Sequence, residues 1–263
     1  MLFDTHIHTE ASPDGGALKP SEAIRIAKEK GIGIIFTEHA DHTPDGLPSF
    51  CVDFNTYPSQ YVKYKSDTVL LGIELNLMNE CIELNTKIAA NPLFDYILGS
   101  VHCTSGFDLG DEVDNTVIHF NKYGEEFNAR HLAYILDTIK NSDCFDSLGH
   151  IDYISRYCVL PEKNLLYERH ADAYDAILST LIERGKLIEV NTRRLTEEGA
   201  LANLTTIYTR YRDLGGKYVT LGSDAHFPEN IGRNFDIAVK MVNEIGLKFA
   251  YFKGRRMLEC ITT

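Results

Sequence analysis

Short apolar runs rich in β-branched residues alternate along the chain with amphipathic stretches. Seven of the runs have the length and composition of buried strands: LFDTHIH (2–8), IGIIFTEH (32–39), VLLGIEL (69–75), YILGSVH (96–102), DSLGHID (146–152), KLIEVNT (186–192) and YVTLGSDAH (218–226). The stretches between them have helical spacing, as at Tyr174, Ile177, Leu178, Leu181 and Ile182. Strands that alternate with helices predict a parallel sheet, either doubly wound or closed into a barrel.

Nothing along the 263 residues divides the chain, since the sequence contains no fixed repeat, low-complexity tract or Pro/Gly/Ser linker. We therefore expect a single α/β domain over residues 1–263, and a barrel of about 250 residues fits this length. Segments 40–68 and 103–124 are the long connections, and both follow predicted strands. We expect these two segments to shape a pocket.

Nearly every predicted strand ends in histidine, aspartate or glutamate. The endings are Asp4-x-His6-x-His8, Glu38-His39, Glu74, His102, His150-x-Asp152, Glu189-x-Asn191 and Asp224-x-His226. In a parallel barrel the carboxyl ends of all strands meet on one face, where active sites are built. The endings therefore predict one polar site.

The residue types at these endings favour metal binding. Side chains two positions apart on a strand point the same way, so His6 and His8 are expected to reach one ion. Imidazole nitrogens and carboxylate oxygens without thiolate suit zinc, iron or manganese. The candidate ligands are six histidines and two carboxylates: His6, His8, His39, His102, His150, His226, Glu74 and Asp224. They are too many for one tetrahedral ion, so we expect two or three divalent ions.

The histidines outside the strand endings are interpreted as ordinary polar residues. A histidine on a strand is more often an ordinary polar residue than a ligand, so four are assigned to surface or helix positions: His42, His119, His131 and His170. The strand-end set differs, because burying six unpaired histidines together would cost several kcal/mol. Asp4 and Asp152 are expected either to bind metal or to hold a histidine by its other nitrogen.

Composition narrows the function classes. The formal net charge of −12 disfavours a broad nucleic-acid surface, while one local cationic site can still bind a phosphorylated small molecule. No run of about 18 apolar residues exists, and the first residues lack the pattern of a secretory signal, so we expect a cytoplasmic protein without a membrane partner. The six cysteines form no C-x-x-C pair and are expected to be reduced and mostly buried.

Other hydrolase chemistries find little support. The sequence contains no G-x-S-x-G motif of a serine hydrolase. Cys103 would point to the opposite side of its strand from His102, away from the predicted site.

Taken in order, the strand-end motifs resemble those of the polymerase and histidinol phosphatase (PHP) superfamily. The matching stretches are Asp4-x-His6-x-His8, Thr37-Glu38-His39-Ala40-Asp41, Glu74, Ser100-Val101-His102, Gly149-His150-Ile151-Asp152, Glu189-x-Asn191 and Gly222-Ser223-Asp224-Ala225-His226. The resemblance implies a distorted (βα)7 TIM-like barrel with two or three metal ions at the carboxyl ends of the strands.

The same resemblance implies three ligand groups: His6, His8 and Asp224; Glu74, which bridges to His102 and His150; and His39 with His226. Members of the family commonly complete the third group with a histidine in the loop after the first motif. Asp14 stands there in this chain. A carboxylate also binds metal, so Asp14 is expected as the remaining ligand.

The motif spacing and the stretch 228–233 look most like the stand-alone histidinol-phosphate phosphatases of the superfamily. That resemblance implies that arginines after the fifth and sixth strands bind the substrate phosphate. The candidates are Arg156, Arg193 and Arg194. A planar guanidinium matches phosphate oxygens with two parallel hydrogen bonds.

The leading hypothesis is a metal-dependent phosphomonoesterase of histidine biosynthesis, in which a metal-bridging hydroxide attacks L-histidinol phosphate. Glu74 would bridge the ions, and either Asp224 or His226 would transfer a proton, or a third ion would coordinate the ester oxygen. A PHP phosphoesterase for another small phosphorylated metabolite or nucleotide is one alternative. A non-catalytic, metal-stabilised binding module is another, and it predicts missing ligands.

Overall fold

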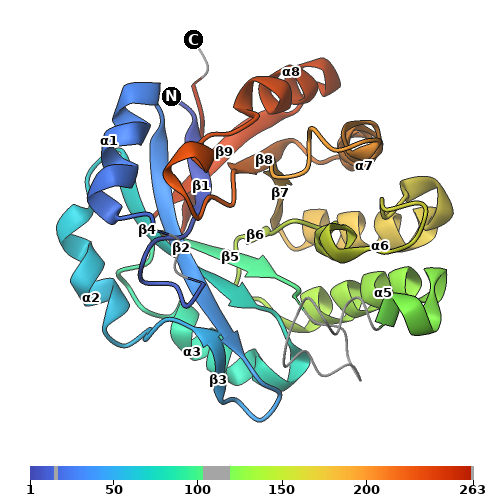
Figure 1. Ribbon diagram of the computed structural model, residues 1–263, viewed down its shortest axis with the longest axis horizontal. Coiled ribbons are helices and arrows are strands. Elements are labelled where there is room, and N and C mark those ends of the chain that lie inside the picture. The colour runs from blue at the N-terminus through green and yellow to red at the C-terminus, as the bar shows by residue number, and fades with distance from the viewer. Residues whose placement is uncertain (15–16, 103–118, 262–263) are drawn as a thin grey trace.

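The computed structural model describes residues 1–14, 17–102 and 119–261. Seven strands run parallel in chain order: β1 (Phe3–Ile7), β2 (Gly33–His42), β4 (Val69–Asn76), β5 (Tyr96–Ser100), β6 (Ser147–Leu148), β7 (Leu187–Asn191) and β8 (Tyr218–Gly222). A parallel bridge from Ile7 to Ala225 joins β1 to the chain just after β8 and closes the circle (Figure 1). The predicted distorted barrel of seven parallel strands is confirmed.

Helices surround these strands on the outside (Figure 1). They are α1 (Pro20–Lys30), α2 (Tyr57–Tyr61), α3 (Ile82–Ala89), α5 (Glu125–Asn141), α6 (Ala171–Glu183), α7 (Ala200–Asp213) and α8 (Phe235–Ile245). Short 3-10 turns lie between some of them: η1 (Val62–Tyr64), η2 (Asn79–Cys81), η3 (Tyr153–Tyr157), η4 (Tyr167–Arg169) and η5 (Pro228–Asn230). Among the described helices, none is long and apolar enough to cross a membrane.

Three strands were not predicted from the sequence. β3 (Pro48–Cys51) pairs antiparallel with the end of β2, while β9 (Lys248–Lys253) and β10 (Arg256–Glu259) form a hairpin. β9 pairs with β8 only at its first two residues, and Phe252 then stacks on Tyr96 of β5, with 5.5 Å between the ring centroids. β9 therefore crosses beneath the amino end of the barrel.

The barrel interior changes from apolar to charged along the strands. At the amino end a separate apolar cluster is formed by Phe3, Ile35, Leu70, Tyr96, Leu98, Leu187, Ala250 and Phe252. Leu70 and Glu74 are four residues apart on β4, so their side chains point to the same face. The apolar cluster therefore forms a floor, and the polar residues gather above it at the carboxyl ends.

Several predicted strands end earlier than the sequence pattern indicates, most of all β6 and β8. β6 consists of two residues, so His150 lies in the turn after it and Asp152 immediately precedes η3. β8 ends at Gly222, and Asp224 adopts a φ of 54°. Loop conformation, rather than a strand period of two, therefore sets the directions of these side chains, although His226 Nδ1 still lies 3.6 Å from Asp224 Oδ1.

Candidate metal centre

The first donor group brings together His6 and His8 from β1 and its end, Glu74 from β4, and Asp224 from the loop after β8. The two Nε2 atoms of His6 and His8 lie 2.9 Å apart. Glu74 Oε2 is 3.3 and 3.4 Å from these nitrogens, and Asp224 Oδ1 is 3.8 and 3.7 Å from them. The four side chains are at most 3% exposed.

These distances fit a tetrahedral ion. Ligand atoms about 2.0–2.1 Å from zinc lie roughly 3.4 Å from one another. Within the described residues, the buried Glu74 Oε2 accepts no hydrogen bond of good geometry despite these neighbours. Two imidazole nitrogens that face each other share one proton at most, whereas a metal ion satisfies both of their lone pairs. The donor set therefore suits an ion better than hydrogen bonds.

A buried carboxylate fixes the tautomer of His6. Its Nδ1 lies 2.7 Å from Glu189 Oε1 on β7, so in the neutral ring the proton is held at Nδ1 and the Nε2 lone pair faces His8 and Glu74. Gly222 makes this contact sterically feasible, because a Cβ there would lie 2.1 Å from Glu189 Oε1 and 2.6 Å from His6 Cβ. The arrangement is typical of a metal-binding histidine with an orienting carboxylate.

A second donor group uses the other oxygen of Glu74. Oε1 lies 3.3 Å from His102 Nε2 and 2.9 Å from His150 Nε2, and these two nitrogens are 3.4 Å apart. Asp41 Oδ2 lies 2.7 Å from His102 Nδ1 and orients that ring as Glu189 orients His6. Glu74 therefore divides its two oxygens between two groups of histidines.

A third group lies at the rim of the first. Asp14 Oδ2 is 3.3 Å from His39 Nε2 and in direct contact with His226 Nε2. The ring of His8 stacks between these two histidines, with centroid distances of 4.1 and 4.4 Å. The structure thus brings Asp14 to the position expected of the remaining ligand.

Electrostatics keep the central carboxylates in the charged form. Burial by itself would raise the pKa of Glu74, but the charges of His6 and His39 outweigh it and hold that pKa well below its usual range. Burial is likewise outweighed at Asp224, where Arg156 and His6 hold the pKa well below normal. Burial and the neighbouring His39 lower the pKa of His8. Ionised carboxylates beside a neutral imidazole are the protonation states that bind cations.

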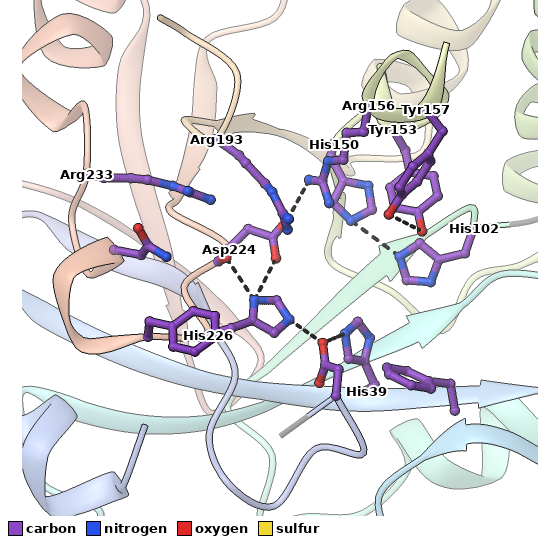
Figure 2. Close-up of a pocket in the computed structure, with 14 residues that line it drawn as sticks. His39, His102, His150, Tyr153, Arg156, Tyr157, Arg193, Asp224, His226 and Arg233 are labelled. Carbon is purple, nitrogen blue, oxygen red and sulfur yellow. Dashed lines mark hydrogen bonds and ion pairs between the residues drawn. The ribbon is translucent and has the colours of Figure 1, made fainter. Parts of the chain in front are cut away.

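A pocket of about 480 Å³ opens above the three groups (Figure 2). Arg156 and Arg193 line it, as the sequence predicts. Arg156 Nη2 lies 2.5 Å from Asp224 Oδ2, and Arg193 Nη1 lies 3.6 Å from the same oxygen. Figure 2 shows both guanidinium groups directed toward Asp224. Asp224 therefore has one oxygen toward the histidines and the other toward the arginines.

Residues 4–193 match the PHP domain family. The chain belongs to the PHP domain family. It is 38% identical over 257 residues to a probable histidinol-phosphatase of Clostridium acetobutylicum, covering 98% of this chain and 99% of that one. A histidinol-phosphatase of Lactococcus lactis is 28% identical over 97% of this chain and 96% of its own length.

A solved structure supports the same fold assignment. The crystal structure of histidinol phosphate phosphatase from Lactococcus lactis, complexed with zinc, L-histidinol and phosphate, is similar with a TM-score of 0.83. The two chains are 25% identical, and the match covers 98% of each.

Arg194 does not join the pocket of this PHP domain. It is 3% exposed, and its guanidinium bonds to Asp152 Oδ2 at 2.5 Å, Asn164 Oδ1 at 2.9 Å and Glu197 Oε2 at 2.9 Å. The expectation that it lines the phosphate site is therefore wrong in placement. Asp152 likewise pairs with an arginine, and in the described part of the chain it bonds to no histidine ring.

Asp4 also differs from its expected role. Its carboxylate accepts hydrogen bonds from Ser223 N at 2.9 Å, Ser223 Oγ at 2.5 Å and Gly232 N at 2.9 Å. It therefore anchors the loop that carries Asp224 and leaves the histidine rings to other carboxylates. Glu189 and Asp41 orient those rings. Both are carboxylates within the strand-end motifs, and that position was the sequence signal by which their orienting role could have been found.

Several pocket residues were not predicted: Phe50, Tyr153, Tyr157, Phe227, Asn230 and Arg233. Phe50 comes from segment 40–68, which therefore shapes the pocket as expected. Segment 103–124 lies mostly outside the described residues. The two tyrosines lie close to Arg156 in sequence, and Arg233 ends the 228–233 stretch. Their closeness to motif residues was the sequence signal that could have placed them in the pocket.

Three of the four histidines that were not expected to bind metal lie in or next to helices. His131 is buried on α5, and His119 and His170 lie in or at the start of helices. His42 corrects the prediction, because it is buried at the end of β2. Cys51, Cys81, Cys144, Cys158 and Cys260 are free thiols, and all except Cys51 are buried. Cys103 lies outside the described residues.

Proposed function

We propose that this PHP domain hydrolyses L-histidinol phosphate to L-histidinol and phosphate. The observation that carries the proposal is the position of Asp224, whose Oδ1 faces the nitrogens of His6 and His8 while its Oδ2 faces Arg156. A metal-binding group and a phosphate-binding group thus share one carboxylate. The full-length resemblance to histidinol-phosphatases supports this choice of substrate.

The donor groups are proposed to hold two or three divalent ions, chosen from zinc, iron and manganese. Zinc is the first to test because the Lactococcus lactis structure contains it. The proposed ligands are His6, His8, Asp224 and Glu74 for the first ion, Glu74, His102 and His150 for the second, and Asp14, His39 and His226 for the third. Bound ions would supply a hydroxide nucleophile near neutral pH and Lewis acidity at the phosphoryl group.

The side chains of the chain itself bind and orient the substrate. Arg156 and Arg193 border the pocket at Asp224, where they can hold phosphoryl oxygens and stabilise the charge that develops on them. Asp224 and His226 are the two candidates for passing a proton to the leaving oxygen, and both line the pocket. Phe50 and Phe227 offer flat apolar surfaces to the imidazole ring of the leaving alcohol.

Hydrolysis is tested by measuring metal content and then phosphate release from L-histidinol phosphate against a panel of phosphomonoesters. We expect the wild type to prefer L-histidinol phosphate and Asp224→Asn to lose most activity and part of the metal. Asp236→Asn is a matched control, since this exposed carboxylate lies at the start of α8. Absence of turnover with any ester by the metal-loaded wild type would contradict the enzyme proposal.

Two further outcomes separate the alternatives. Turnover of other esters without turnover of L-histidinol phosphate would favour a PHP phosphoesterase for a different metabolite. Stable metal binding with no hydrolysis would favour the non-catalytic binding module, against which the complete set of ligands argues.

We also propose that residues 1–263 form one domain. Strands β1 and β8 lie side by side although they come from opposite ends of the chain, with His8 N donating to Ala225 O at 2.9 Å. A single cooperative unfolding transition, seen at the same denaturant concentration by two probes, is expected. Two separate transitions would contradict the proposal.

A further inference from the structure

Arg233 lies in the loop between η5 and α8 and lines the same pocket as Arg156 and Arg193. Its Nε and Nη2 donate to the carbonyl oxygen of Ser223 at 3.1 and 3.0 Å. Among the described residues, its Nη1 has no hydrogen-bond partner. Figure 2 shows the guanidinium extended toward Asp224 and Arg193. The Nη1 group of a firmly held guanidinium therefore remains available to donate to a ligand.

The anchor of Arg233 is rigid. Ser223 is fully buried, and Asp4 accepts hydrogen bonds from both its backbone N–H and its hydroxyl, at 2.9 and 2.5 Å. Arg233 thus binds a carbonyl whose residue is held on its other side by a buried carboxylate. A donor fixed before the ligand arrives loses little conformational entropy on binding.

The charge of the pocket points to a dianionic ligand. Arg156, Arg193 and Arg233 carry three positive charges around the carboxylate of Asp224, while a second lining carboxylate, Asp14, pairs with His39 and His226. Burial, with the charges of Arg193 and Arg156, lowers the pKa of Arg233, although Asp224 opposes the shift. Like charges held together at such a cost are typical of a site built for a ligand of opposite charge.

We propose that Arg233 is a third phosphate-binding arginine, which makes this subsite selective for dianionic phosphate monoesters. The inference rests on the proposed phosphatase function and assigns a residue to its specificity. Once Asp224 neutralises one guanidinium, two positive charges remain. They match a phosphate monoester, which carries a charge of about −1.5 to −2 at pH 7.

Inorganic phosphate binding to the purified, zinc-loaded protein tests the proposal by isothermal titration. We expect Arg233→Gln to bind inorganic phosphate roughly 10- to 100-fold more weakly, on the scale of one lost charge-assisted hydrogen bond. Phenylphosphonate, at a pH above its second pKa where it is a dianion, and its monoanionic methyl ester provide the charge comparison. The ratio of their affinities should fall about tenfold in Arg233→Gln, because the second negative charge loses its partner.

Two further variants make the result specific. Arg233→Lys keeps the charge but loses the two-donor grip on Ser223, so we expect it to retain most of the preference for the dianion. Arg212→Gln is the matched control, because Arg212 also donates to a backbone carbonyl, that of Ile245, and does not line the pocket. It should bind phosphate as the wild type does.

Arg233→Gln with full zinc content and wild-type affinity for inorganic phosphate would overturn the proposal. Equal weakening for the dianion and the monoanion would also overturn it. If Arg233→Gln loses zinc or does not fold, the same comparison is made with Arg233→Lys, where loss of the dianion preference with zinc retained would count against the role of charge. Failure of the phosphatase proposal is a separate result: no turnover of L-histidinol phosphate, with phosphate binding still dependent on Arg233.

Discussion

The two ends of the barrel both bury charged groups, but they satisfy them differently. At the amino end each carboxylate has a cationic partner: Asp146 bonds to Arg255 at 2.7 and 3.0 Å, and Asp95 lies 2.7 Å from Lys65 Nζ. At the carboxyl end, histidine nitrogens face other histidine nitrogens and Glu74 is shared among several rings. Opposite charges are paired at one end, whereas electron-pair donors converge at the other.

This difference distinguishes a structural polar cluster from a ligand site. Donors and acceptors in matched numbers complete one another, so the amino end needs nothing from solution. Converging lone pairs leave buried polar atoms without suitable partners, which is costly unless a cation binds. Each end can therefore be disrupted separately, and the effects should separate into stability at one end and metal binding at the other.

Replacing Glu74 should produce the largest loss. Glu74→Gln removes one of the two oxygens that serve both histidine groups, so the protein should bind fewer equivalents of zinc. Its kcat for the favoured ester should fall roughly 10³-fold, on the scale of losing a preorganised stabilising group. Metal analysis and phosphate release measure the two effects. Asp95→Asn at the opposite end is the control, and its zinc content should match the wild type.

At the amino end, removing a cation should act on stability alone. Arg255→Ala leaves the buried carboxylate of Asp146 unpaired, so the free energy of unfolding should fall by about 3 kcal/mol. Urea denaturation measures the loss. The zinc content of the folded fraction should be unchanged, and a variant that lost zinc in proportion to stability would show that the two ends are coupled.

A methyl group at Gly222 should cause a smaller, local effect. Gly222→Ala forces Glu189 away from His6, since the added Cβ would lie 2.1 Å from Glu189 Oε1. Zinc affinity should fall up to roughly 100-fold, as when an orienting partner of a metal ligand is lost. Gly246→Ala is the comparison, because its Cβ meets nothing within 4 Å and only its φ of 87° is strained. Chelator competition should distinguish the two variants.

The smallest effect is expected at Asp41. Asp41→Asn keeps an oxygen that accepts the Nδ1 proton of His102 but removes the negative charge, so zinc affinity should fall about tenfold. Asp53→Asn on the same segment controls for charge, since Asp53 is exposed and its carboxylate bonds only to its neighbours Asn55 and Thr56 among the described residues. Equal zinc affinity in the two variants would contradict an orienting role for Asp41.

Sequence reasoning predicted the strands and the ligand residues because both follow periodic or repeated patterns. Seven apolar runs gave the parallel strands, and their polar endings converged as barrel geometry requires. β9 was not predicted, because it ends in no histidine, aspartate or glutamate and packs beneath the barrel instead of contributing to the site. Its partners, such as Tyr96, are distant in sequence and come together only in the folded chain.

The finer details of the site depended on loops. Asp224 has a left-handed backbone in a loop whose Ser223 is held by Asp4, and a period of two carries no information about such a conformation. Arg194 is a second case in which the sequence did not show where a side chain points. An arginine beside a motif can face the pocket or the interior, and Asp152, 42 residues away, decides which.

The apolar floor under the histidines has a kinetic consequence. Within the described part of the chain, Phe3, Tyr96, Phe252 and their neighbours fill the barrel below the site, so the pocket opens on one side only. An ester whose phosphoryl group lies deepest must place its alcohol toward the opening. The alcohol then departs first and phosphate last, and inorganic phosphate should inhibit competitively against the ester.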